Sequence, residues 1–196
     1  MAAESKRDQL IKTALELFYR DGFKATGIDK ILAEAGVAKM TLYKHFPSKE
    51  ALICAVLRRR DEEFRDWAMK YVETHAATPR ERLLALFDAH YNWFSERNFR
   101  GCLFLNAAAE FAGNTESITA IALEHKKLLH GYIRGLASAT GAHNPDELAD
   151  WLLLLLDGAI SGAQLTMTAD WAMHAKGAAA RLIDSAATPP LQPGTG

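Results

Sequence analysis

The stretch Val37–Lys49 reads V-A-K-M-T-L-Y-K-H-F-P-S-K and predicts a short helix with two different sides. Val37, Leu42 and Phe46 are apolar at spacings of five and four, so they can pack on a small core while the polar side faces out. The polar side and the residues just beyond it carry Lys39, Thr41, Tyr43, Lys44, His45 and Lys49. No Asp or Glu interrupts the run, so a phosphate backbone would meet only hydrogen-bond donors there. The stretch therefore predicts a surface that docks on DNA.

Two further helices are predicted upstream of this stretch. The first spans about Ser5–Arg20, and Gly22 can end it in a left-handed conformation. Thr26 and Asp29 form a near capping box for the second helix, with Asp in place of the usual Glu or Gln, and Gly36 ends that helix. Helix, glycine-containing turn and helix follow one another closely, which is typical of a helix-turn-helix.

The segment Gly22–Leu52 resembles the TetR/AcrR family of bacterial transcription factors, and it lies in about the first quarter of the chain. The resemblance implies a three-helix DNA-binding domain, a larger helical effector domain and a homodimer. Residue by residue it implies that Lys39 reads base edges, that Thr41, Tyr43 and His45 contact phosphate or sugar, that Lys44 lies at the DNA edge, and that Thr26 and Lys49 bind phosphate near helix N-termini. Ala38 departs from the pattern, because a Ser or similar cap is usual there; the lost capping bond is worth about 1 kcal/mol.

Composition bounds the fold and the compartment. The chain has 196 residues and a formal net charge of -1, so it can bury a core without disulfides or metal, and any positive field must be local. Strand-like alternation is absent, which predicts an all-α fold of about nine helices. Cys54 and Cys102 are expected to be free thiols. An amphipathic stripe follows Lys6 and Arg7 in place of a signal peptide, so a cytoplasmic protein is expected.

The pattern of caps and breakers divides the chain into a helix-turn-helix domain over 1–48, a helical effector and dimerisation domain over 49–187, and a Pro- and Gly-rich tail over 188–196 predicted to be disordered. Six helices are predicted after Pro47: Ser48 to about His75, Thr78 to about Arg97, Cys102 to about Phe111, a helix marked by the apolar residues between Ile118 and Leu136, Asn144 to about Thr168, and Trp171 to about Ala186.

The last two of these helices predict a homodimer. No Lys or Arg occurs from Gly135 through Ala175, and Leu152–Leu156 are five consecutive leucines, an apolar surface too broad for one core. Small residues would let a second copy approach and form a four-helix bundle. The predicted interface residues are Leu152, Leu155, Ala159, Gly162, Ala163, Ala179, Leu182 and Ile183. A membrane span over Trp151–Ala169 is not expected, because it contains Asp157 and Gln164 and lacks basic anchors.

Aromatic and polar residues of the second domain make it a candidate binder of a small molecule, which is expected to be apolar or aromatic. The candidate lining residues are Trp67, Tyr71, Tyr91, Phe94, Cys102, Asn106, Glu110, Trp151 and Met167. Asn106 and Glu110 are the sharper signal, because polar groups on an apolar helix need partners. Most of the aromatics are expected to be simply core, because a filled core uses the same residue types as a cavity lining. Cys102 can be an inert core residue or a thiol sensor activated by a helix N-terminus.

Catalytic motifs are absent: the sequence has no nucleophile elbow, no phosphate loop, and no H-E-x-x-H pair among seven histidines. No enzyme activity, cofactor or metal is therefore expected. The sequence predicts a ligand-responsive transcription factor, foremost a repressor, that binds a palindromic operator in double-stranded DNA as a dimer and is released by an effector. The alternative is a helical small-molecule-binding module or enzyme on the same fold without specific DNA binding.

Overall fold

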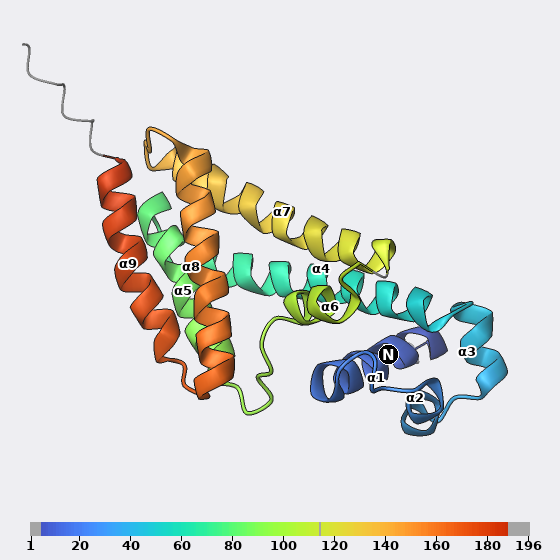
Figure 1. The fold of residues 1–196 in the computed structure, drawn as a ribbon. Helices are drawn as coiled ribbons and strands as arrows, with labels where there is room; N and C mark the ends of the chain where they lie inside the picture. Colours follow the sequence, from blue (N-terminus) through green and yellow to red (C-terminus); the bar gives the residue numbers. More distant parts are fainter. Residues whose placement is uncertain (1–4, 114, 188–196) are drawn as a thin grey trace, which may run out of the picture. The chain divides into compact units, whose positions relative to one another are not determined.

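The structure, a computed structural model, describes residues 5–113 and 115–187, and these ranges contain nine helices and no strand (Figure 1). The helices are α1 (Lys6–Asp21), α2 (Ile28–Ala35), α3 (Lys39–His45), α4 (Lys49–His75), α5 (Pro79–Phe94), α6 (Leu103–Phe111), α7 (Glu116–Ala139), α8 (Pro145–Thr166) and α9 (Asp170–Ala186). The all-α prediction is confirmed. The tail predicted over 188–196 lies outside the described residues.

The chain forms two compact units. The first, hereafter unit 1, comprises Met1–Arg65 and Arg100–Lys126; the second, unit 2, comprises Asp66–Phe99 and Lys127–Gly196. Since α4 and α7 run through the points of division, each contributes residues to both units. The division predicted at residue 48 concerns function rather than compactness and stays a prediction.

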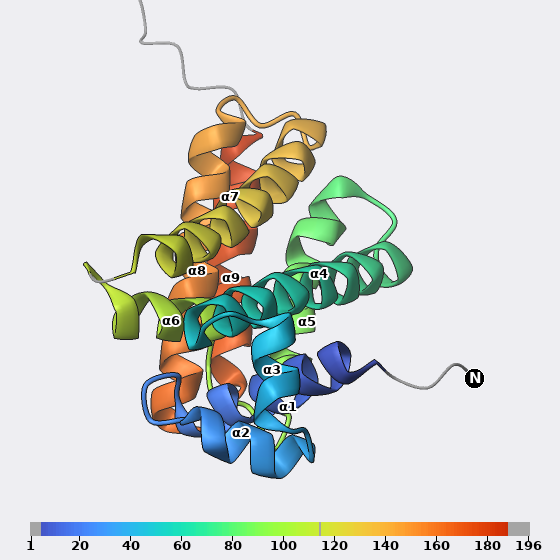
Figure 2. The same ribbon diagram turned by 90° about the vertical axis from the view of Figure 1, so that its right-hand side faces the viewer.

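Unit 1 places α1, α2 and α3 together (Figure 2). Their shared core consists of side chains no more than 2 % exposed, among them Leu10, Leu17, Phe18, Ile31 and Leu42. Phe23, which follows α1, adds its ring to this core at 5.1 Å from the ring of Phe18. These contacts fix α3 on the unit through Leu42 and leave its other side open.

Local capping signals explain some of the helix ends. Thr78 and Glu81 form a capping box at the start of α5 around Pro79, and Gly36 ends α2 in the left-handed conformation at φ 61°. The capping box predicted for α2 is wrong, because Gly27 is its N-cap and makes no side-chain cap bond. Thr26 lies one residue too early because the loop after α1 turns its hydroxyl into the core.

Unit 2 packs α5, α8 and α9 side by side (Figure 1). Lys176 on α9 donates to Asp88 on α5 at 2.6 Å. Trp171, at the start of α9, lies over Gly162 of α8 and donates through Nε1 to Thr166 Oγ1 at 2.9 Å. Gly162 thus allows a close contact within one chain.

Adding a methyl group at Gly162 is expected to destabilise unit 2. An added Cβ would lie 2.4 Å from Cδ2 of Trp171, so the ring must shift and lose its bond to Thr166. Gly158 on the same helix has nothing within 4 Å of an added Cβ, so Gly158→Ala is the matched control. Both variants gain the higher helix propensity of alanine, so this gain drops out of the comparison between them. Urea unfolding should find Gly162→Ala less stable than Gly158→Ala by about 1–2 kcal/mol. Equal midpoints and slopes would contradict the contact.

Among the described helices, α8 is the one that is long and apolar enough to cross a membrane by length and composition. Of its most apolar 18 residues, 44 % are buried inside the protein. A core helix of a folded domain has the same composition, and the packing of α8 against α5 and α9 accounts for it here.

Candidate nucleic-acid interface

The helix α3 presents the polar surface that its sequence predicts. Leu42 is fully buried and Phe46, just after the helix, is 3 % exposed, so these two side chains anchor it. Lys39, Lys44 and His45 are exposed, Tyr43 is 42 % exposed and Thr41 is half-buried. Ala38 is the N-cap and makes no side-chain cap bond, as its sequence predicts. The arrangement is that of a short helix mounted to enter a groove.

Thr26 does not share this surface. Its side chain is fully buried, and its hydroxyl donates to the carbonyl oxygen of Gly22 at 2.7 Å. A hydroxyl held in this way has no free surface for a phosphate, which corrects the phosphate contact predicted for Thr26. The residue holds the loop between α1 and α2 instead.

Lys49 begins α4 beside that same loop. Its Nζ donates to the carbonyl oxygen of Lys24 at 3.4 Å. Burial lowers the pKa of Lys49 below its ordinary value, although the nearby Glu110 carboxylate acts in the opposite direction. Lys49 therefore remains a candidate phosphate ligand, half-buried at the edge of the α3 surface.

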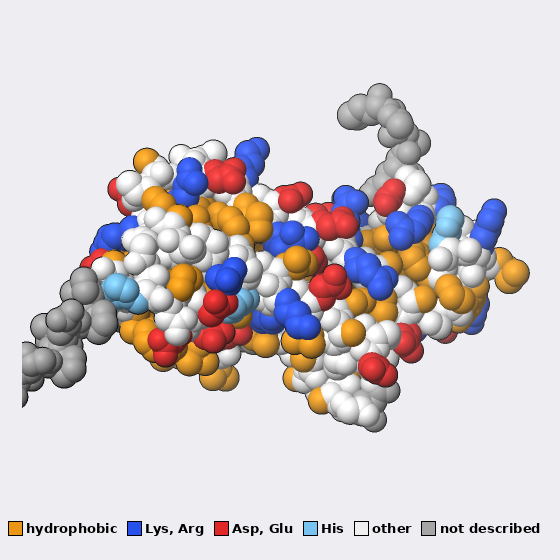
Figure 3. All heavy atoms as spheres, turned by 90° about the horizontal axis from the view of Figure 1, so that it is seen from above, with side chains coloured by type: hydrophobic (Ala, Val, Ile, Leu, Met, Phe, Trp, Pro, Cys, Tyr) orange, Lys and Arg blue, Asp and Glu red, His pale blue; other side chains and the backbone are white. Residues whose placement is uncertain are grey.

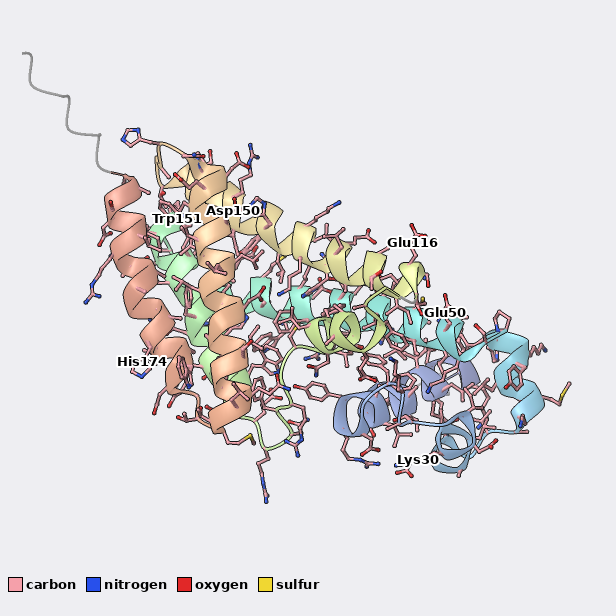
Figure 4. All side chains as sticks on the ribbon, in the orientation of Figure 1. Lys30, Glu50, Glu116, Asp150, Trp151 and His174 are labelled. Atoms are coloured by element: carbon pink, nitrogen blue, oxygen red, sulfur yellow. The ribbon has the colours of Figure 1, made fainter. Side chains whose placement is uncertain are left out.

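Two side chains that the sequence pattern did not assign to this surface also lie on or beside α3. Met40 is 81 % exposed, next to Lys39. Asp29, from α2, places Oδ1 3.5 Å from Lys39 Nζ, so an acid reaches a surface that is free of acids in sequence. Lys30, labelled in Figure 4, is paired with Asp21 at 3.0 Å. A helical wheel of α3 alone cannot reveal Asp29, because it comes from another helix.

Glu110 has a role other than the predicted ligand contact. Its carboxylate accepts hydrogen bonds from the main-chain N–H groups of Phe23 at 3.0 Å and Lys24 at 2.8 Å. Phe111 adds an edge contact to Phe23, with ring centroids 5.8 Å apart. The end of α6 thus secures the loop that precedes α2, and all these residues belong to unit 1. Glu110 has partners within the protein, so the signal that suggested a ligand is explained without one.

The other candidate ligand residues are spread over both units. Asn106 of unit 1 donates to the carbonyl oxygen of Arg100 at 3.2 Å, and Cys102 is 5 % exposed. In unit 2, Trp67 lies 6.5 Å from Tyr71 between ring centroids, and Phe94 is buried. Tyr91, Trp151 and Met167 are exposed at 38 %, 40 % and 70 %, so they lie at the surface of their unit. Ligand binding by this set stays a prediction.

The predicted dimer residues need a correction. Leu152, Ala159, Ala163, Ala179 and Ile183 are each no more than 3 % exposed within one chain, and Leu155, Gly162 and Leu182 are half-buried. The five buried residues form the core between the helices of unit 2, so a second copy cannot touch them directly. The exposed apolar side chains of α8 and the residues after it are Trp151 (labelled in Figure 4), Leu154, Leu165 and Met167, with Trp171 and Met173 on α9. The sequence predicted apolar surface on these helices but not the rotation of each helix about its axis, and the dimer interface itself stays a prediction.

A buried polar cluster joins α4 to α7 inside unit 1. His125 is 2 % exposed, stacks on Phe104 with ring centroids 3.7 Å apart, and lies 2.7 Å from Asp61 through Nδ1. Because the carboxylate only accepts, Nδ1 carries the proton. Burial lowers the pKa of His125 from 6.5 to about 4, although the bond to Asp61 opposes this. Burial alone would raise the pKa of Asp61, but hydrogen bonds from Arg65 and His125 hold it below its ordinary value.

Charge elsewhere is mixed. Figure 3 shows basic and acidic side chains interspersed on the face that it presents, in keeping with the net charge of -1. Figure 4 labels Glu50, the second residue of α4, and Glu116, the first residue of α7; Ser117 of α7 donates to Glu50. Within the described ranges no group of three or more His, Cys, Asp or Glu side chains could hold a metal ion.

Comparison with known families divides the chain in two. Residues 10–56 match the bacterial regulatory proteins of the tetR family, and residues 79–179 match the tetracyclin repressor-like C-terminal domain. The second match alone covers more than half of the chain.

Two individual relatives are also named as transcriptional regulators. The transcriptional repressor KstR2 of Mycolicibacterium smegmatis is 33 % identical over 107 residues, covering 53 % of this chain and 50 % of the repressor. The transcriptional activator FasR of the same species is 36 % identical over 98 residues, covering 50 % of this chain and 44 % of the activator. The alignments thus span about half the length of these two curated relatives.

Solved structures share the whole fold. A TetR-family transcriptional regulator from Streptomyces coelicolor superposes with a TM-score of 0.87 at 26 % identity, covering 93 % of this chain and 96 % of that one. Regulatory protein TetR from Rhodobacter sphaeroides gives a TM-score of 0.78 at 25 % identity, covering 89 % and 96 %.

Proposed function

The chain belongs to the tetR family of bacterial regulatory proteins, and from this premise we propose that it is a cytoplasmic, dimeric repressor that binds a palindromic operator and is released by a small-molecule effector. The resemblance seen in Gly22–Leu52 is thereby confirmed, and the family consists of transcriptional regulators rather than enzymes. The observation that carries the proposal is the exposed basic side of α3 on the buried anchors Leu42 and Phe46.

The proposed docking puts α3 in the major groove of each half-site. The first residues of such a helix meet base edges, which assigns base reading to Lys39, while Tyr43, Lys44 and His45 lie further along and meet the backbone. Two copies related by a two-fold axis need half-sites about 34–36 Å apart.

The dimer surface is formed by the exposed apolar residues of α8 and α9. Trp151 and Trp171 are each 40 % exposed and Leu154 is 71 % exposed, on helices that already pack together within one chain. Burying these side chains against a second copy removes apolar surface from water and gives the symmetric pairing that a palindrome requires.

Leu154→Glu should shift the chain to monomers in sedimentation equilibrium and weaken operator binding.

The effector is a small apolar or aromatic molecule bound in the region that matches the repressor-like C-terminal domain. Within it, His90, Trp93 and Phe94 form a buried aromatic cluster with Phe99, with neighbouring ring centroids 4.9–5.9 Å apart. A ligand that binds more tightly to a dimer whose two α3 helices have another spacing lowers operator affinity by linkage.

Removing the charge of Lys44 is expected to weaken binding to every duplex without changing the preferred sequence. Loss of one phosphate contact should reduce the slope of log affinity against log salt by about 0.9. Lys127→Ala removes another exposed lysine, which belongs to unit 2, and serves as the control. Fluorescence anisotropy over a salt series measures both slopes, and identical slopes for the two variants would remove Lys44 from the interface.

Selection of bound sequences from a random duplex pool at physiological salt tests the function itself. The proposal expects a palindrome with half-sites about one helical turn apart. Binding without any preferred sequence would refute it and favour the alternative, a ligand-binding module on the same fold. A recovered operator placed upstream of a reporter gene then distinguishes repression from the activation named for FasR.

A further inference from the structure

Asp29 lies where an acid is least expected on a surface that meets phosphates. It is the second residue of α2, and its Oδ1 lies 3.5 Å from Nζ of Lys39, the first residue of α3. The two side chains are 88 % and 62 % exposed, so both are open to a partner. Asp29 and Lys39 belong to the same compact unit.

Stability does not explain the pair, because ion pairs this exposed contribute little to folding. Binding to DNA in general does not explain it either. A carboxylate beside the DNA-facing helix repels every phosphate it approaches and cancels part of the attraction that Lys39 supplies. The pair therefore lowers affinity for an arbitrary duplex.

The pair does match one feature of the major groove. A G·C pair shows the acceptors O6 and N7 of guanine beside the donor N4 amino group of cytosine. An ammonium group and a carboxylate held next to each other present the complementary donor and acceptor. We propose that Asp29 is a specificity-determining residue, which reads one G·C pair of each half-site together with Lys39: Lys39 donates to guanine and Asp29 accepts from cytosine.

The inference rests on the proposed function and adds a reason for selectivity. On the operator the carboxylate gains the cytosine amino group as a donor. On any other duplex it keeps its repulsion for phosphate without that gain. Selectivity is the difference between the affinity for the operator and the affinity for other duplexes. Asp29 enlarges this difference because it strengthens the first and weakens the second.

Glu34→Gln is the matched control for Asp29→Asn. Glu34 is also exposed on α2, and its substitution removes the same charge. Affinities are measured for the wild type, both variants, Lys39→Ala and the double variant Asp29→Asn/Lys39→Ala. The probes are the selected operator, the operator changed at each position in turn, and a scrambled duplex.

Asp29→Asn should lower the preference for G·C at one position of the half-site by about tenfold and tighten binding to the scrambled duplex severalfold, while Glu34→Gln changes neither. When Lys39 is already replaced by alanine, Asp29→Asn should not relax the base preference at any further position of the half-site. If Asp29→Asn and Glu34→Gln behave alike, the inference is overturned and the proposed function stands. The same holds if Asp29→Asn relaxes the base preference at a position that Lys39→Ala does not affect. A wild type without any preferred sequence would overturn both.

Discussion

Replacing Glu110 with alanine is expected to lower the free energy of unfolding by about 3 kcal/mol and to weaken operator binding at the same time. The carboxylate accepts the main-chain N–H groups of Phe23 and Lys24, and Phe23 is fully buried. Hydrogen bonds to a charged group are worth more than neutral ones, and a buried donor left without an acceptor keeps its full desolvation cost. The loop that loses these two hydrogen bonds leads directly into α2, so the packing that holds α3 in place should loosen as well.

Glu124→Ala is the control for this substitution, since Glu124 is exposed on α7 in the same compact unit. Urea unfolding at fixed protein concentration gives the stability, and hydrogen exchange at the Phe23 and Lys24 amides reports the loop itself. Unchanged protection of these two amides in Glu110→Ala would contradict the assigned contact, whatever happens to the global stability.

Lowering the pH from 7 to 5 is expected to remove about 2 kcal/mol of stability through His125 alone. Burial depresses its folded-state pKa to about 4 from 6.5, so the unfolded chain binds more protons than the folded one between these values. Stability is therefore complete above pH 6.5 and decreases as the pH decreases towards 4. Asp61, whose pKa is also depressed, adds its loss only below its own ordinary value of 3.8.

His125→Gln separates this effect from that of all other titrating groups, because an amide can donate to Asp61 but does not titrate in this range. Its unfolding free energy should change less than that of the wild type between pH 7 and pH 5, by about 2 kcal/mol. Parallel losses in the two proteins would assign the pH dependence to other groups.

Features that depend on neighbours along the chain could be predicted from the sequence. The capping box of Thr78 and Glu81, the glycine that ends α2 and the missing cap at Ala38 are all present in the structure. Each rests on contacts within four residues, where backbone geometry leaves few alternatives. The anchors Leu42 and Phe46 follow from spacing on one helix.

Features that depend on contacts between distant segments could not be predicted in the same way. The approach of Asp29 to Lys39 and of Glu110 to Phe23 needs the packing angle of one helix on another. Thr26 is a polar residue whose burial depends on the path of a loop. For α8 the sequence predicted a broad apolar surface, yet a run of leucines does not say which side of the helix faces the core, where Leu152 is buried and Leu154 is exposed.

The compact unit that holds α3 is discontinuous in sequence, since Arg100–Lys126 completes Met1–Arg65. This has a consequence for synthesis on the ribosome. The DNA-reading helix emerges early, but Glu110 and Phe111, which secure the loop before α2, are made only after the whole of unit 2's first segment. At about 5–20 residues per second, a delay of several seconds separates Arg65 from Lys126. During that time the nascent chain has an incomplete unit whose apolar surface is exposed and available to chaperones. Such a unit cannot hold α3 firmly in place. A fragment that ends at Arg65 should therefore bind the operator poorly.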